Sequence, residues 1–510
     1  MFVCRTMCAL RRTASQRDEQ LKKTQGWGLG LLCLVLAAAA VAQQEKPADL
    51  VLKGDVTGAQ HKTYFEVPFT VPAGVHRISV DFYYTGRDQR ATLDLGIRDP
   101  QRFRGESGGN KSHFTISETD ATPSYLPGEI PAGQWRLIIA VPNMRPQVVS
   151  HYQADIRFNS RIEDAAFTAE PLAIGTRWYR GDLHMHTGHS DGSCKSQGGQ
   201  RVPCPLFLTV QAAASRSLDF IAITDHNTDS HDEPLRELQP YFDHLLLIPG
   251  REMTTFYGHF NVFGVTQFMD WRISKGGLDL NAVLRDARAK GGIASVNHAE
   301  APEGEQCMGC RWMPSTDLDV SLFSAVEVIN YGQIMFSSAK YWDAQLHAGH
   351  RLAAVGGSDN HNATIPAGEA SAIGWPATAV EANDLSVPAI MDGIRHGRTF
   401  IDLTASRDKM LDFEAEAQGT SAKMGGTLHT SGGAAITVHI HAIAAEGSVA
   451  HLLLDGEDSN PALPLEGGRS DTQATVTASA GRHYLRLEVR DHNGATELIS
   501  SPLYINFPEE

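Results

Sequence analysis

The sequence predicts a central α/β region between two β-sandwich domains. Between about residues 177 and 403, short continuous apolar runs alternate with helix-like stretches, a grammar typical of strands buried on both faces of a parallel sheet. On either side, apolar and polar residues alternate within short runs broken by turns, which is typical of strands with one solvent-facing side. We therefore expect domains over residues 48–165, 175–404 and 410–508.

Length and composition agree with several domains and exclude one class of partner. The chain has 510 residues, of which 42% are hydrophobic, enough for more than one buried core. Its formal net charge is −15, and no basic run interleaved with aromatic residues occurs. Nucleic-acid binding needs such basic surfaces, so we expect no nucleic-acid partner.

The N-terminal 42 residues resemble an export signal. Basic residues precede an apolar run over residues 29–42, which ends in Ala40-Val41-Ala42 before polar Gln43. This pattern predicts a signal peptide over residues 1–42, cleavage after Ala42, and a periplasmic or extracellular protein without stable membrane insertion. The alternative is an uncleaved membrane anchor, because the basic segment is long for a signal peptide.

Four cysteines remain after the predicted cleavage: Cys194, Cys204, Cys307 and Cys310. An even number in an exported chain indicates disulfides, although four cysteines permit three pairings. We expect Cys194 to pair with Cys204 and Cys307 with Cys310, each closing a loop. The alternative, a zinc site from the C-x-x-C pair, lacks a second pair of ligands.

The elements follow in chain order. In the first domain we expect strands over residues 63–67, 76–82, 92–97 and 135–140. In the central region we expect strands over 220–223, 245–248, 292–296, 325–329 and 352–355, with helices over 206–217, 280–290 and 338–348. In the last domain we expect strands over 435–441 and 483–489.

Chemistry-bearing residues follow the central strands directly. His184, Asp225, Glu252, Asn297 and Asp359 each stand at or just after a predicted strand end. The carboxyl ends of parallel strands are where α/β barrels place their reactive groups. We therefore expect these side chains to meet in one site.

The segment from Gly181 to Gly192 contains a possible metal-binding motif. In an extended chain, His184 and His186 point to one face, and Asp191 returns from the following loop. With 22 histidines, roughly one His-x-His is expected by chance, and the pair at His439 and His441 is such a case, which we interpret as an exposed strand face. The first pair differs because further motifs follow it in order: Asp225-His226, Gly250-Arg251-Glu252, Gly258-His259, Asn297-His298 and Gly357-Ser358-Asp359-Asn360-His361.

This ordered set resembles the PHP (polymerase and histidinol phosphatase) superfamily and, within it, the CehA/McbA-like metallohydrolases, whose members include exported proteins and a carbaryl hydrolase. The resemblance covers about residues 178–403. It implies a distorted (β/α)7 barrel that holds two or three metal ions at its C-terminal face.

Carried over by position, the resemblance implies a ligand set. One ion would be held by His184, His186, Glu252 and Asp359. A second would share Glu252 and add His259 and His298. A third would use Asp191, His226 and His361. The candidate catalytic residues are Glu252, His259 and Asp359.

The residue types support a hydrolytic metal site. Mixed imidazole and carboxylate ligands suit zinc, manganese or iron. Three carboxylates leave two or three divalent ions with a net positive charge, which favours an anionic small-molecule substrate. We expect a metal-dependent hydrolase in which metal-bound hydroxide cleaves a phosphoester, without a separate protein nucleophile.

Several alternatives remain open at this point. The same site would also suit an ester, carbamate or amide hydrolase. An alternative from another functional class is that the protein is a surface binding protein with an inactive barrel. Asp182 and Asp225 are interpreted either as orienting a ligand imidazole or as strand-end caps. Lys195 and Arg201 are interpreted as solvated loop charges or as a phosphate clamp. The sequence does not indicate an oligomeric state.

Overall fold

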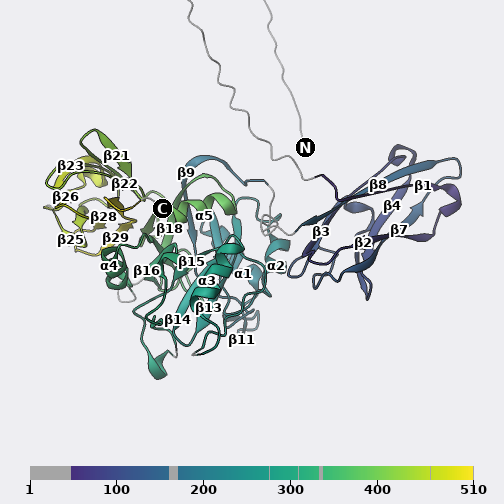
Figure 1. Cartoon of the computed structure of the whole chain (residues 1–510), viewed down its shortest axis with the longest axis horizontal. Coiled ribbons are helices and arrows are strands. Elements are labelled where there is room, and N and C mark those ends of the chain that lie inside the picture. The colour runs from purple at the N-terminus through teal and green to yellow at the C-terminus, as the bar shows by residue number, and fades with distance from the viewer. Residues whose placement is uncertain are drawn as a thin grey trace, which may run out of the picture. The chain divides into compact units, whose positions relative to one another are not determined.

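The computed structural model describes residues 47–159, 170–274, 276–307, 309–331, 337–459 and 461–508 (Figure 1). The predicted signal peptide and the last residues of the predicted first domain lie outside these ranges. Within the described ranges, no helix combines the length and apolar character needed to cross a membrane.

The first domain consists of two four-stranded antiparallel sheets. One has the order β1 (Leu50–Thr57), β8 (Val149–Asn159), β3 (Arg77–Tyr84), β6 (His113–Ser117), and the other the order β2 (Tyr64–Val71), β7 (Gly133–Asn143), β4 (Thr92–Arg98), β5 (Phe103–Glu106). Alternating apolar side chains from both sheets share one core, in which Phe82, Phe114 and Trp135 are fully buried. This arrangement is a β-sandwich.

The central strands belong to one mixed sheet. Its order is β17 (Ala353–Gly357), β16 (Ala325–Asn330), β15 (Ile293–Val296), β14 (Gly258–Phe263), β13 (Leu246–Thr255), β12 (Phe220–Ile223), β9 (Ile174–Asp182), β18 (Ala377–Asp384), β19 (Thr399–Asp402). The described helices are α1 (Leu206–Ser215), α2 (Asp232–Leu238), α3 (Leu280–Ala289), α4 (Ala339–Ala348) and α5 (Val387–Arg395). The strands and helices predicted individually in this region therefore form.

The (β/α)7 barrel implied by the resemblance is wrong. The described chain is mostly β-structure, and its five α-helices are fewer than the seven that such a barrel needs. No helix separates β13 from β14, because the chain turns back at Phe256 and Tyr257 into an antiparallel hairpin. Strand β18 is antiparallel to both β9 and β19. Apolar runs predicted strands, but periodicity carries no information on strand direction, and the runs that form β14 and β18 were not among those predicted.

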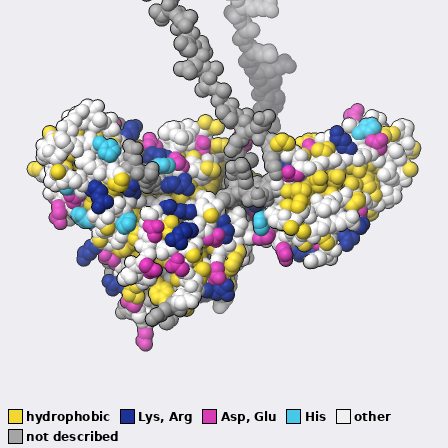
Figure 2. All heavy atoms as spheres, viewed as in Figure 1, with side chains coloured by type: hydrophobic (Ala, Val, Ile, Leu, Met, Phe, Trp, Pro, Cys, Tyr) yellow, Lys and Arg dark blue, Asp and Glu magenta, His cyan; other side chains and the backbone are white. Residues whose placement is uncertain are grey.

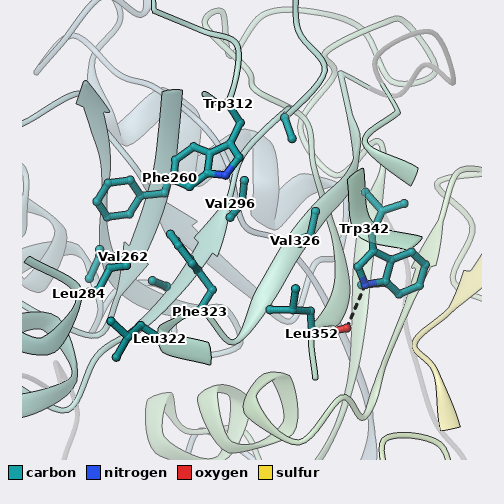
Figure 3. Close-up of a cluster of buried hydrophobic side chains, with 14 of the residues drawn as sticks. Phe260, Val262, Leu284, Val296, Trp312, Leu322, Phe323, Val326, Trp342 and Leu352 are labelled. Atoms are coloured by element: carbon teal, nitrogen blue, oxygen red, sulfur yellow. Dashed lines mark hydrogen bonds between the residues drawn. The ribbon is translucent and has the colours of Figure 1, made fainter. Parts of the chain in front are cut away.

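One hydrophobic cluster packs the central strands against α3 and α4 (Figure 3). Phe260 and Val262 of β14 pack with Leu284 of α3 and with Phe323, which precedes β16. The apolar face of α3 is buried, and Asp279 caps the helix by accepting a hydrogen bond from the Ala282 amide. The rigid sheet backed by this core holds the strand ends that carry the candidate site.

The last domain shares its sheet with the central region. Strands β29 (Thr496–Ser500), β28 (His483–Arg490), β24 (Val449–Leu454) and β25 (Glu457–Asp458) extend the central sheet beyond β19, with β22 (Thr427–Leu428), β26 (Leu463–Pro464) and β30 (Leu503–Ile505) attached. A second sheet, in the order β21 (Thr420–Lys423), β20 (Met410–Ala417), β23 (Ala435–Ile443), β27 (Arg469–Thr477), closes the core. The last two predicted domains are thus joined by continuous strand pairing.

Candidate metal centre

The ends of neighbouring strands bring the candidate ligands together. His184 follows β9, Glu252 lies on β13, and His259 lies on β14. His298 follows β15, and Asp359 follows β17. All nine predicted positions lie in one cluster: His184, His186, Asp191, His226, Glu252, His259, His298, Asp359 and His361.

Glu252 occupies the middle of the cluster and is almost fully buried. Its Oε1 atom lies 3.2 Å from both His259 Nδ1 and His298 Nε2. The same oxygen lies 3.3 Å from His184 Nε2. Its Oε2 atom lies 2.8 Å from His226 Nδ1. Both oxygens of one carboxylate are therefore surrounded by imidazole nitrogens.

Asp359 provides a second, partly buried carboxylate beside the same imidazoles. Its Oδ1 atom lies 3.1 Å from His186 Nε2 and 3.5 Å from His184 Nε2. Its backbone has a φ of +50°, and His298 has a φ of +26°. Side-chain-bearing residues rarely adopt this left-handed region, and such strain concentrates at functional sites.

The outer part of the cluster reaches solvent. Asp191 Oδ1 lies 3.3 Å from His361 Nε2 and 3.6 Å from His226 Nε2. The Asp191 side chain is 58% exposed, whereas that of Glu252 is 1% exposed. The outer group therefore lies on the solvent-facing side of the cluster.

The grouping of the side chains differs from the one carried over by resemblance. Their ligand atoms form four sets, each with all atoms within 4.8 Å of one another. The sets are His184 with His186 and Asp359, His184 with Glu252 and His298, His226 with Glu252 and His259, and His186 with Asp191, His226 and His361. His259 and His298, expected to share one ion, thus fall into different sets, and His186 joins the outer one.

The donor set fits divalent transition-metal ions. Ligands around a zinc ion at about 2.0–2.2 Å lie roughly 3.3 Å from one another in tetrahedral geometry, close to the separations around Glu252. His184 is fully buried and its Nε2 atom satisfies no hydrogen-bond geometry among the described residues. A buried imidazole nitrogen that faces two carboxylates without a hydrogen bond fits the role of an ion ligand.

Burial and neighbouring charges shift the pKa values of several groups in the cluster. Burial opposes ionisation of Glu252 and Asp359, but the neighbouring imidazoles hold the pKa of both carboxyl groups well below the usual range. Burial lowers the pKa of His186 to about 4. At the outer edge, Asp191 and Asp359 overcome the effect of burial and raise the pKa of His361 to about 9. The carboxylates of Glu252 and Asp359 therefore stay charged.

Asp182 and Asp225 hold backbone segments instead of ligand imidazoles. Asp182 accepts hydrogen bonds from the amides of His184, Ser358 and Gly374, which joins three loops around the site. Asp225 accepts from both the amide and the hydroxyl of Thr187. Of the two interpretations offered from the sequence, the capping one applies to both residues.

Asn297, which the sequence placed in the site but not among the predicted ligands, contacts Glu252. Its Nδ2 atom donates a 2.9 Å hydrogen bond to Glu252 Oε1, and the side chain is fully buried. A polar side chain directly after an apolar strand and before His298 was the available signal. His189, by contrast, contacts Ser230 at 2.9 Å and takes no part in the cluster.

A disulfide-closed hairpin borders the outer group. Strands β10 (Ser193–Lys195) and β11 (Arg201–Pro203) pair antiparallel, and the Ser193 amide donates to the His361 carbonyl at 2.7 Å. Both predicted disulfides form: Cys194 with Cys204, and Cys307 with Cys310. Lys195 and Arg201 are exposed on this hairpin, and Arg201 Nε donates to Ser193 Oγ at 3.0 Å.

No family model matches the chain, and no curated protein matches it. Arguments about function therefore rest on the site itself.

Proposed function

We propose that this protein is an exported metal-dependent hydrolase that cleaves an anionic phosphoester, in the manner of the PHP superfamily metallohydrolases it resembles. The observation that carries the proposal is Glu252, a buried carboxylate with four imidazole nitrogens within 3.3 Å of its oxygens. The two disulfides support export, since disulfides persist in oxidising compartments.

The residues of the site have separate roles in this proposal. Two or three divalent ions, when bound, supply an activated water and a Lewis acid for the scissile oxygen. Glu252, His184 and His298 hold the inner position away from bulk water. His361 and Asp191 hold the outer position, where the substrate enters. Asp182 holds the loops that carry these ligands together through its hydrogen bonds to their amides.

An anionic substrate follows from the charges. Three ligand carboxylates against two or three divalent ions leave the filled site positively charged. Arg201, held by Ser193 beside the outer group, adds a cation at the border. On the face drawn in Figure 2, basic and acidic side chains are interspersed, which suits a small substrate better than a polyanion.

The test is hydrolysis by residues 43–510, reconstituted with Mn²⁺ or Zn²⁺. The substrates are p-nitrophenyl phosphate, its bis ester and p-nitrophenyl acetate, each assayed with and without a chelator. We expect chelator-sensitive turnover of a phosphate ester. Turnover of the acetate alone would contradict the phosphoester assignment and favour a carboxyl-ester hydrolase. Metal binding without any turnover would favour a binding protein.

The chain contains its own matched control. The double variant His184→Gln/His186→Gln removes the His-x-His pair of the cluster and should abolish both tight metal binding and turnover. The variant His439→Gln/His441→Gln removes the same motif from β23, where His441 contacts Asp471, and should leave both unchanged. Equal loss in both variants would indicate a nonspecific effect.

A further inference from the structure

We infer that Glu327 is a positioning residue of the inner metal position. One of its carboxylate oxygens holds the proton of His184 on Nδ1, and the other holds the backbone amide of His298. The inference rests on the proposed metal site and deepens it. Glu327 lies on β16 between apolar neighbours, and it is 2% exposed. Its side chain points away from the core side of the strand, where Val326 and Val328 pack.

The first contact defines the tautomer of His184. Glu327 Oε1 lies 2.8 Å from His184 Nδ1, and a carboxylate oxygen can only accept. Nδ1 therefore carries the proton, which leaves Nε2, 3.3 Å from Glu252 Oε1, as the nitrogen that can bind an ion. An imidazole whose second nitrogen donates to a carboxylate is held in the orientation and tautomer that ion binding requires.

The second oxygen acts on another ligand. Glu327 Oε2 accepts from the backbone amide of His298 and from Asn330 Nδ2, both at 3.1 Å. His298 has the left-handed φ of +26°, so this contact helps to hold a strained backbone. His184 and His298 belong to the same set around Glu252. One carboxylate thus supports two ligands of one ion position.

The surrounding backbone leaves room for this side chain. The pairing of β16 with β17 shifts register between Glu327 and Ile329, and such irregularities re-aim side chains beside functional sites. At the end of β17 lies Gly357, where a Cβ atom would stand 2.5 Å from Glu327 Oε1 and 2.4 Å from His184 Cβ. Only glycine permits the carboxylate and the imidazole to meet there.

The three donors require a carboxylate. Glu327→Gln keeps the size but has a single acceptor oxygen, so it cannot accept from His184 and from His298 together. Its amide group would instead face an N–H donor. We expect an affinity about 10–100-fold lower for one ion, while the ion of the outer group keeps its affinity. Glu497→Gln is the control, because Glu497 on β29 accepts from Ser448 Oγ at 2.7 Å and contacts no imidazole in any described interaction.

The experiment is chelator competition with Zn²⁺ on residues 43–510, together with the visible spectrum of the Co²⁺-loaded protein. Weaker binding of one ion and an altered Co²⁺ spectrum in Glu327→Gln, but not in Glu497→Gln, would support the inference. Unchanged affinity and spectrum would overturn it. If Glu327→Gln does not fold, Glu327→Asp, which keeps the charge but retracts the carboxylate, should show the same selective loss.

The failure of this inference can be distinguished from the failure of the proposed function. If the wild-type chain binds ions but hydrolyses none of the esters, the hydrolase proposal fails. The affinity measurements on Glu327→Gln then still test whether Glu327 positions the ion ligands. If the wild-type chain binds no ion, both fail. A third readout needs no ion: the His184 Nδ1 proton should give an exchange-protected downfield resonance in wild type that is absent from Glu327→Gln.

Discussion

Glu252 interacts with more partners than any other carboxylate of the cluster, because it lies on β13 between β12 and β14 and faces loops from both directions. Asn297 Nδ2 donates to its Oε1 atom, and His226 Nδ1 lies 2.8 Å from its Oε2 atom. Removing it would leave several buried imidazoles without a counter-charge. It is therefore the residue whose loss the site tolerates least.

For Glu252→Ala we expect activity to fall by more than about 100-fold, since even residues that only support metal ligands contribute about 10–100-fold. The ions of two sets should be lost together, as measured by metal content after gel filtration. Glu414→Ala, on the exposed face of β20, is the control for a lost glutamate. A folded Glu252→Ala protein with full metal content would show that Glu252 is not shared between ions.

The hairpin of β10 and β11 is an element whose conformation depends on a covalent link. Beyond the disulfide, the Cys204 amide donates to the Gly192 carbonyl at 2.9 Å, and the Gly188 amide donates to the Cys204 carbonyl at 2.7 Å. These contacts surround Asp191. The disulfide thereby holds the loop that supplies the outer carboxylate.

For Cys194→Ser/Cys204→Ser we expect a loss of about 2–3 kcal/mol in the free energy of unfolding, because the link closes a short loop. We also expect weaker binding at the outer ion position, measured by chelator competition. The control is Cys307→Ser/Cys310→Ser, which opens a different loop. If outer-site affinity is unchanged without the first disulfide, the hairpin does not position Asp191.

Strand β28 carries an ion-pair row that predicts a pH dependence of stability. Glu488 lies between Arg486 and Arg490 on one face, with contacts of 2.6 Å to each. Burial would raise the pKa of Glu488, but the two guanidinium groups hold it below the usual value. A carboxyl group with a depressed pKa in the folded state stabilises the fold above its unfolded pKa of about 4.3, and this contribution disappears as the pH falls through the folded pKa.

Glu488→Gln should therefore lower the free energy of unfolding by about 1.5–3 kcal/mol at pH 7, and the difference from wild type should shrink below about pH 4. Urea unfolding at pH 7 and at pH 3.5 measures both values. Glu414→Gln, an exposed position, should show little difference at either pH. A difference that stays constant across this range would contradict the role given to the arginines.

At the scale of the whole molecule, the central region and the last domain share a sheet and a core. Strand β19 pairs with β29, and Tyr484 and Tyr504 belong to the hydrophobic cluster that backs the central sheet. The Leu352 amide donates to Tyr504 Oη at 3.0 Å. The boundary predicted near residue 410 is therefore crossed by strand pairing, apolar contact and hydrogen bonds.

A chain ending at residue 408 should not fold. Each buried large side chain contributes about 1.5–3 kcal/mol, and losing Tyr484, Ile499, Tyr504 and Phe507 from the cluster removes an amount comparable with a typical total stability of about 5–15 kcal/mol. Soluble yield, circular dichroism and thermal unfolding, compared with residues 43–510, measure this. Cooperative unfolding of the short chain would mean that the central region is an independent domain.

The sequence by itself indicated many of the local elements and the candidate ligands. Apolar runs marked β12, β15 and β16 because strands buried on both faces have few polar residues. His184, Glu252 and Asp359 stood out because they belong to an ordered set of motifs at the predicted strand ends. Cysteine number and expected export indicated disulfides, and the structure selects the expected pairing from the three that four cysteines permit.

Only the tertiary structure decided how these pieces are arranged. Strand direction depends on pairing between distant segments, so the antiparallel β13–β14 hairpin and the β9–β18 pair were invisible to periodicity, and the barrel expectation was wrong. The grouping of His259 with His226, and of Glu327 with His184, likewise depends on side-chain directions at neighbouring strand ends. Local patterns record what each segment buries, whereas contacts between segments far apart in the chain determine which groups meet.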